Sequence, residues 1–119
     1  MTDSMPVLSL VSPTYNEAGG IENLVIAIHR VMEEAKIPYE LIIVDDNSPD
    51  GTAQMAEQLG QQFPVRVLKR PGKLGLASAV IDGWAMAKGS VFGVIDADLS
   101  HDPKLLPWLV RSVTSPVAM

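Results

Sequence analysis

Short apolar segments alternate with stretches of helical periodicity along the chain. Four segments rich in Val, Ile and Leu have the length of buried strands, at residues 7–11, 39–44, 65–68 and 91–95. The stretches between them place apolar side chains at the i, i+3, i+4, i+7 spacing of amphipathic helices. The three predicted helix faces consist of Ile21, Leu24, Val25, Ile28 and Val31 or Met32, then Ala53, Ala56, Leu59 and Phe63, then Leu76, Ala77, Val80, Ile81 and Trp84. A fourth helix is expected to begin near Pro103, with Asp102 as its cap.

This alternation predicts an α/β fold. Strands that alternate with helices form βαβ units around a parallel sheet. The strand segments are almost continuously apolar, as expected when helices cover both faces of the sheet. We therefore expect a Rossmann-like, mostly parallel sheet with flanking helices. No repeat or linker divides residues 1–119, so they form one expected domain, and residues 114–119 end it without a closing element, as in a truncated chain.

Composition narrows the classes of function. The chain has 47% hydrophobic and 19% charged residues, which is typical of a soluble globular domain. A net charge of −5 disfavours binding to nucleic acid. The absence of cysteine excludes disulfides and thiolate metal sites and fits a reducing compartment. We also expect no membrane span and no signal peptide, because no apolar segment approaches about 20 residues.

Polar segments follow all four predicted strands. In an open α/β sheet, ligands bind beyond the carboxyl ends of the strands, where these segments converge. The segments occupy residues 12–17, 45–51, 69–75 and 96–98. No P-loop or GxGxxG fingerprint is present among them. The sequence therefore predicts a polar site at one edge of the sheet that is built differently from those two motifs.

The fourth segment contains two carboxylates separated by one residue, Asp96 and Asp98. Residues i and i+2 leaving a strand point the same way. Two carboxylates on one side suit Mg²⁺ or Mn²⁺, with water and phosphate oxygens completing the coordination. Such a metal can neutralise charge on a diphosphate leaving group. The alternative is that Asp98 only flanks or caps the next helix.

The second segment begins with adjacent acids, Asp45 and Asp46, whose side chains must diverge. We expect one of them to order the turn and the other to face the crevice. Asp46 is the candidate for accepting N–H bonds from a nucleobase edge. The alternative is a local turn and helix start, which is the preferred interpretation for residues 47–51.

Other candidate groups have weaker signals. The basic cluster of Arg66, Lys69, Arg70 and Lys73 predicts either a phosphate contact or a solvated loop, with no preference between them.

Both histidines and both tryptophans have structural interpretations. His29 lies beside an apolar helix stripe and is expected to be structural or solvated. His101 is expected to contact or cap a helix rather than bind a metal or phosphate. Trp84 and Trp108 have helical spacing to apolar neighbours, which predicts core positions.

Taken together, the segments resemble the family 2 glycosyltransferases of the GT-A fold, and within them the dolichyl- and polyprenyl-phosphate mannosyltransferases. The matching pieces are PTYNE at residues 13–17, VDDNSPDGT at 44–52, RPGKLGL at 70–76 and DADLSH at 96–101. Their order and spacing agree over almost the whole chain. PTYNE and DAD mark the superfamily, whereas SPDGT and RPGKLGL are more specific to the polyprenyl-phosphate branch.

The resemblance implies a role for each matching position. The implied nucleoside-binding set is Pro13, Tyr15, Glu17, Val44 and Asp46. Asp96 and Asp98 would hold Mg²⁺ or Mn²⁺ and the diphosphate, with Ala97 lining the donor site and Asp98 serving as the catalytic residue. The family often has Gln at the position of Ser100. Ser is shorter than Gln, so the role of Ser100 stays open. Family domains are also longer, so the chain corresponds to their nucleotide-binding half, without the acceptor half.

The expected activity is transfer of mannose from GDP-mannose to a dolichyl or polyprenyl phosphate. That lipid acceptor would bring the enzyme to a membrane surface, at the cytoplasmic face. Two alternatives stay open: a family 2 enzyme that uses a UDP-sugar, and a noncatalytic nucleotide-binding fragment. A phosphoryl-transfer domain with Asp96 as nucleophile is disfavoured, because such domains usually carry that acid on their first strand.

Overall fold

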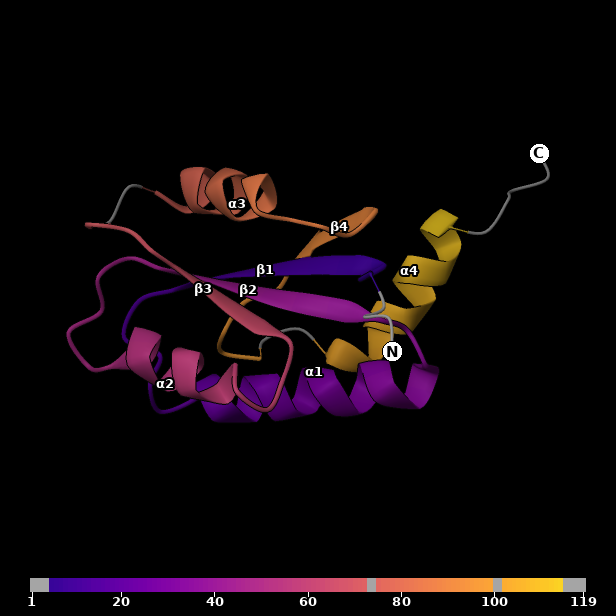
Figure 1. The fold of residues 1–119 in the computed structure, drawn as a ribbon, viewed down its shortest axis with the longest axis horizontal. Helices are drawn as coiled ribbons and strands as arrows, with labels where there is room; N and C mark the ends of the chain where they lie inside the picture. The colour runs from indigo at the N-terminus through magenta and orange to yellow at the C-terminus, as the bar shows by residue number, and fades with distance from the viewer. Residues whose placement is uncertain (1–4, 73–74, 100–101, 115–119) are drawn as a thin grey trace.

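Four parallel strands form the centre of the molecule. The computed structural model describes residues 5–72, 75–99 and 102–114. The strands are β1 (Leu8–Thr14), β2 (Tyr39–Asp45), β3 (Val65–Lys69) and β4 (Val91–Val94), in the spatial order β3-β2-β1-β4 (Figure 1). The predicted parallel α/β sheet is confirmed. Strand β1 runs past its predicted end at residue 11, because residues 12–14 stay paired with β2.

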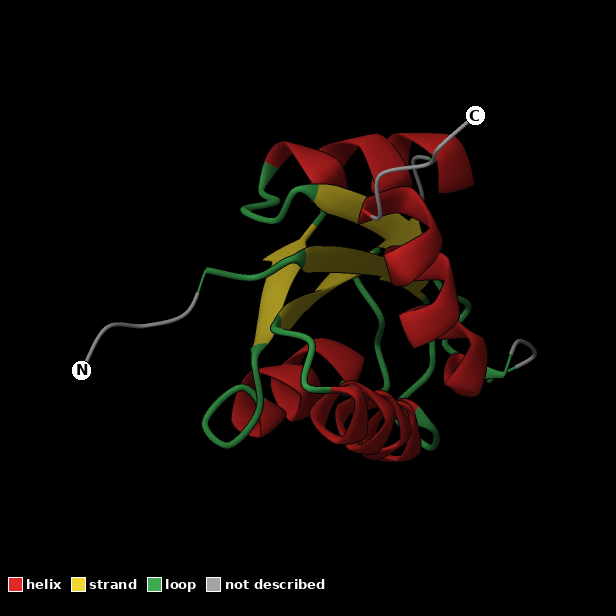
Figure 2. Cartoon of the chain, turned by 90° about the vertical axis from the view of Figure 1, so that its right-hand side faces the viewer, coloured by secondary structure: helices red, strands yellow, loops and turns green. Residues whose placement is uncertain are grey.

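Helices cover both faces of this sheet and make three layers (Figure 2). Helices α1 (Ile21–Ala35) and α2 (Thr52–Leu59) lie on one face, and α3 (Leu76–Ala85) lies on the other. The short 3₁₀ helix η1 (Pro103–Leu105) leads into α4 (Leu106–Thr114), which packs near α1. The predicted cap of this last segment is confirmed, since the Asp102 carboxylate accepts a hydrogen bond from Lys104 N at 2.9 Å. Among the described residues, no helix combines the length and hydropathy needed to cross a membrane.

Alternation along the central strands builds two separate cores. Leu10, Leu41 and Ile43 face α1 and α2 in the larger cluster. Their neighbours in sequence, Val11 and Ile42, face α3 in the smaller cluster. Successive side chains on a strand point to opposite faces, so a strand covered on both sides is apolar at most positions.

The predicted core face of α3 is wrong in part. Ala79 and Gly83 are its buried residues, whereas Leu76 and Ile81 are 66% and 63% exposed. Small side chains let this helix approach the sheet closely. A Cβ built on Gly83 would lie 2.8 Å from both methyl groups of Val11. The hydrophobic pattern favoured the larger residues, of which Leu76 and Ile81 lie on the outer side of the helix, whereas Val80 and Trp84 are half-buried.

One tryptophan also departs from its predicted core position. Trp108 is 65% exposed, because α4 uses Leu106 and Val110 to pack into the larger core. Trp84 is half-buried beside the smaller core, and its indole N–H donates to Gly93 O at 3.3 Å. Of the two interpretations of His29, the structure supports the structural one, because its imidazole shares a 2.8 Å hydrogen bond with the Tyr39 hydroxyl.

Replacing Gly83 with Ala should destabilise the protein although Ala is the better helix former by about 1 kcal/mol. Steric overlap with Val11 should cost about 1–3 kcal/mol, so the expected net loss is about 1 kcal/mol, or a few degrees in Tm. Thermal unfolding of Gly83→Ala beside Gly19→Ala tests this, because Gly19 has open space around its Cβ position. An unchanged or raised Tm for Gly83→Ala would contradict the close approach of α3.

Candidate functional site

The loops that follow β1 and β2 are joined by hydrogen bonds at the carboxyl edge of the sheet, on the left in Figure 1. The backbone N–H of Asn16 donates to Ser48 Oγ at 2.9 Å, and that of Glu17 donates to Thr52 Oγ1 at 2.9 Å. Ala18 N–H donates to the Asp50 carboxylate at 3.1 Å. The predicted convergence of these two segments is therefore confirmed.

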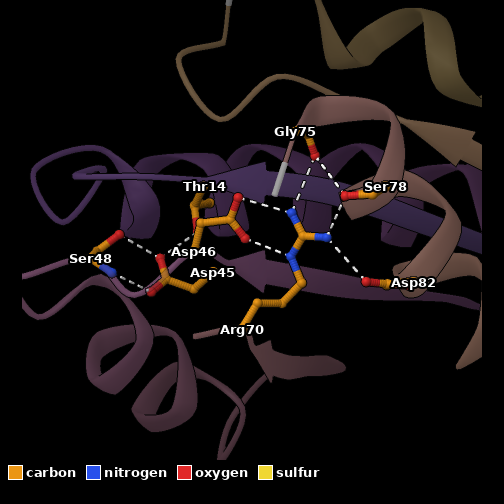
Figure 3. A network of polar contacts seen from close by, with 8 residues as sticks. All are labelled: Thr14, Asp45, Asp46, Ser48, Arg70, Gly75, Ser78 and Asp82. Carbon is orange, nitrogen blue, oxygen red and sulfur yellow. Dashed lines mark hydrogen bonds and ion pairs between the residues drawn. The ribbon is translucent and has the colours of Figure 1, made fainter. Parts of the chain in front are cut away.

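The two adjacent acids after β2 diverge as expected. Asp45 is buried and orders the turn, because its carboxylate accepts from Thr14 Oγ1 at 2.7 Å and from Ser48 N at 2.9 Å (Figure 3). The preferred interpretation of residues 47–51 as a turn is also confirmed. Asp50 accepts a hydrogen bond from Thr52 N at 3.1 Å, where α2 begins. Asp46 is left as the acid on the other side of the strand.

Asp46 forms a two-point ion pair with Arg70 (Figure 3). Arg70 Nε donates to one Asp46 carboxylate oxygen at 2.6 Å, and Nη2 donates to the other at 2.9 Å. The remaining donors of the guanidinium go to Ser78 Oγ at 2.8 Å, Asp82 at 3.0 Å and the Gly75 carbonyl at 3.2 Å. The Asp46 hydrogen bonds raise the pKa of Arg70, burial opposes them, and Asp82 raises the pKa further.

The predicted basic cluster is therefore not one patch. Arg70 is only 5% exposed and all five of its N–H groups donate, so it is neither a solvated loop residue nor a free phosphate ligand. Arg66 pairs with Glu40 at 2.8 Å towards the other end of the sheet, and Lys69 pairs with Glu57 at 3.1 Å on the surface. Lys73 lies outside the described residues.

The acids after β4 alternate with buried residues. Asp96 and Asp98 are exposed, whereas Ile95 and Ala97 are 3% and 5% exposed in the larger core. Strand β4 ends at Val94, but the Ile95 N–H still donates to Val11 O at 3.0 Å, which keeps this segment beside β1. The alternation turns both carboxylates outward, as the prediction required.

Negative charge accumulates across three loops of this edge. Burial raises the pKa of Glu17, and the charges of Asp98 and then Asp50 raise it further. Negative charges that repel Glu17 favour a cation beside it, and carboxylate oxygens are donors that Mg²⁺ and Mn²⁺ prefer. Within residues 5–72, 75–99 and 102–114, however, no three His, Asp or Glu side chains form a metal cage. A metal held here by one or two of these carboxylates would take its remaining ligands from a bound substrate and water.

The remaining predicted site residues differ in accessibility. Tyr15 is 40% exposed at the edge, and Pro13 is half-buried at the end of β1. Val44 has no exposed surface and packs under α3 with Val11. Its contact with a nucleoside stays a prediction, as do the roles of the other site residues. Ser100 and His101 lie outside the described residues.

A wide groove elsewhere carries none of the predicted site residues. It has a volume of about 840 Å³ and lies between α1 and the η1–α4 segment, with Arg30, Glu34, Lys104 and Arg111 in its walls. The groove mixes both signs of charge and lies away from the loops that follow β1, β2 and β3. The carboxyl edge is therefore the better candidate site.

In open parallel α/β sheets, ligands bind in the crevice beyond the carboxyl ends of the strands, which is where these loops meet. The chain belongs to the family described as glycosyl transferase family 2, whose sequence profile matches residues 9–118. It is 42% identical over 106 residues to the dolichol-phosphate mannosyltransferase of Pyrococcus furiosus, covering 89% of this chain and 30% of that protein. The chain thus spans less than a third of this relative's length.

Solved structures agree with the family. The mannosyltransferase PcManGT from Pyrobaculum calidifontis, in complex with GDP-Man and Mn²⁺, superposes with a TM-score of 0.71 at 25% identity, over 89% of this chain and 33% of that one. The glucosyl-3-phosphoglycerate synthase of Mycobacterium tuberculosis, with Mn²⁺, UDP and its product, gives 0.72 at 27% identity, over 92% and 40%. The GT-A fold implied by the sequence is confirmed.

Proposed function

We propose that the protein containing this chain transfers mannose from GDP-mannose to a dolichyl or polyprenyl phosphate. The observation that carries this proposal is the group of carboxylates of Glu17, Asp50 and Asp98 at the carboxyl edge, beside the Asp46–Arg70 pair, on a family 2 glycosyltransferase fold. The name of the Pyrococcus furiosus relative supports the lipid acceptor, and the GDP-Man bound to PcManGT supports the donor.

The proposed roles follow the loops. Pro13, Tyr15, Glu17, Val44 and Asp46 form the nucleoside end of the site. Asp96, Ala97 and Asp98 form the diphosphate end, where the two carboxylates would hold Mg²⁺ or Mn²⁺. A bound metal would supply the positive charge that stabilises the departing diphosphate. The Mn²⁺ bound in two structural neighbours supports a divalent metal.

The proposed transfer is one nucleophilic displacement at the anomeric carbon of mannose. An oxygen of the lipid phosphate forms the new bond to that carbon, and the bond to GDP breaks with its electron pair going to the diphosphate, which inverts the centre. A phosphate monoester has a second pKa of about 6 and is largely dianionic at neutral pH. The acceptor therefore needs no dedicated general base from this half of the site.

The chain would supply the donor half of this reaction. We propose that residues 1–119 form the sugar-nucleotide-binding portion and that the acceptor contacts come from elsewhere in the protein. The lipid acceptor would place the reaction at a membrane surface, at its cytoplasmic face.

Binding of nucleotides to the complete protein tests the donor. We expect GDP with Mn²⁺ to raise the Tm by several degrees, because a ligand at 100 times its Kd adds about 2.7 kcal/mol. Transfer of labelled mannose from GDP-mannose to a polyprenyl phosphate should follow. Binding without transfer or donor hydrolysis would instead support a noncatalytic nucleotide-binding protein.

A UDP-sugar donor is the second candidate, because the Mycobacterium tuberculosis neighbour binds UDP on the same fold. UDP and UDP-glucose therefore belong in the same panel. A shift produced by UDP alone would replace the mannosyl donor with a UDP-sugar and leave the family assignment intact.

A further inference from the structure

Two arginine–carboxylate pairs lie on the α3 face of the sheet, one at each end of the smaller core. Glu40, Ile42, Val44 and Asp46 alternate along β2 and its end, so all four share one face. Glu40 pairs with Arg66 towards the start of the strands, and Asp46 pairs with Arg70 beyond their carboxyl ends. Only the second pair lies in the candidate site.

Building on the proposed function, we propose that Arg70 is a positioning residue that holds Asp46 in the orientation required to read the nucleobase. The guanidinium is a planar fork, so its two bonds to Asp46 fix both the place and the plane of that carboxylate. An ionised carboxylate has about four acceptor positions, and Arg70 occupies two of them. The remaining acceptor positions are left for base N–H donors.

The orientation of Arg70 itself is set by α3. Its other N–H groups donate to Ser78, Asp82 and the Gly75 carbonyl, at the start and in the middle of that helix. Gly75 has a φ of 99°, a conformation that favours glycine, and it directly precedes the first helical turn. Helix α3 in turn rests directly on the sheet through Ala79 and Gly83. Asp46 is therefore oriented by a helix that carries none of the predicted site residues.

This arrangement favours a base edge that donates. A carboxylate held by an arginine stays an acceptor, and guanine offers it a ring N–H and an exocyclic NH₂ on one edge. Uracil offers one ring N–H. Both bases therefore present a donor to Asp46, and either nucleotide can be used to test its role.

Arg66 provides a matched control for Arg70. Both arginines come from β3 or its end, both lie on the α3 face, and both pair with a largely buried carboxylate. Arg66 also donates to Met86 O at 2.8 Å, so it too joins the sheet to the segment after α3. Arginine-to-lysine changes at the two positions keep the charge and remove the fork.

Calorimetric titration of the complete protein with Mn²⁺ and either GDP, UDP or pyrophosphate tests the proposal. Arg70→Lys should weaken binding of the preferred nucleotide about tenfold and leave pyrophosphate binding within about twofold. Arg66→Lys should leave both affinities within about twofold while also lowering the Tm. In transfer assays Arg70→Lys should raise the KM for the donor with little change in kcat.

Other results would overturn the proposal. Unchanged nucleotide affinity in Arg70→Lys would remove the positioning role, and equal weakening of nucleotide and pyrophosphate would make Arg70 a residue of general stability. If Arg70→Lys does not fold, Asp82→Asn decides. A few-fold loss of nucleotide affinity alone supports the role, and an unchanged affinity overturns it. A wild-type protein that binds pyrophosphate but neither nucleotide would overturn the proposed function and this inference together.

Discussion

Replacing Asp98 with Asn is expected to lower sugar transfer by about 10²–10³-fold, the scale seen when one group that stabilises transition-state charge is lost. Asn keeps the size of the side chain and removes the negative charge that would hold a divalent metal against the diphosphate. Asp98 is exposed, so the change should hardly alter folding. The measurement is kcat and KM for GDP-mannose in the complete protein, over a series of Mn²⁺ concentrations.

Asp102 provides the control for this variant. It is a nearby acid whose carboxylate accepts from Lys104 N at 2.9 Å at the start of η1. Asn caps helices about as well as Asp, so Asp102→Asn should keep the wild-type rate. A wild-type rate in Asp98→Asn would end the assignment of Asp98 as the metal-holding catalytic residue. A loss in both variants would point to the loop rather than to the charge at Asp98.

The sequence predicted the sheet well because its central strands carry a strong signal. A strand buried on both faces must be apolar at almost every position, as residues 41–44 are. The prediction failed at α3, where close packing selects Ala79 and Gly83 over larger side chains. Hydrophobic periodicity ranks residues by size and polarity, so it cannot identify a helix face that packs through small residues.

The sequence predicted the location of the candidate site but not the contacts within it. Strand order and loop position brought Glu17, Asp46 and Asp98 to one edge, because the carboxyl ends of parallel strands lie together. The pairing of Asp46 with Arg70 joins residues 24 positions apart in sequence and depends on the direction in which each side chain leaves its strand. RPGKLGL was a visible motif, but the sequence contained no signal for the partner of its arginine.

Glu40→Gln is expected to lower the free energy of unfolding by about 2 kcal/mol at pH 7. The Glu40 carboxylate is buried and accepts from Ser9 Oγ at 2.6 Å, Lys88 N at 2.7 Å and Arg66 at 2.8 Å. An amide keeps one acceptor oxygen and places an NH₂ against donors. Breaking a buried ion pair can cost about 3–5 kcal/mol, but Arg66 is 35% exposed and water recovers part of that loss.

The stability lost in Glu40→Gln should decrease as the pH falls. Burial alone would raise the pKa of Glu40, but the hydrogen bonds from Ser9, Lys88 and Arg66 outweigh it and lower the pKa. Because the pKa of Glu40 is lower in the folded state, its charge stabilises the fold at pH values above the unfolded pKa of about 4.3. This stabilisation is lost as the pH falls through the folded pKa. The difference in Tm between wild type and Glu40→Gln should therefore shrink below about pH 4.

Thermal unfolding from pH 7 to pH 3 measures both effects. At pH 7 a loss of about 2 kcal/mol corresponds to roughly 6–10 °C in Tm for a domain of this size. Glu57→Gln is the control, because Glu57 pairs with Lys69 on the surface, where an ion pair contributes about 0–1 kcal/mol. A Tm difference for Glu40→Gln that stays constant down to pH 3 would mean that the lost contacts do not depend on the charge of Glu40. In that case the hydrogen bonds of Glu40 with Ser9, Lys88 and Arg66 would stabilise the fold without any contribution from the charge of Glu40. The Glu40–Arg66 pair would then resemble the Asp46–Arg70 pair only in its position on the α3 face.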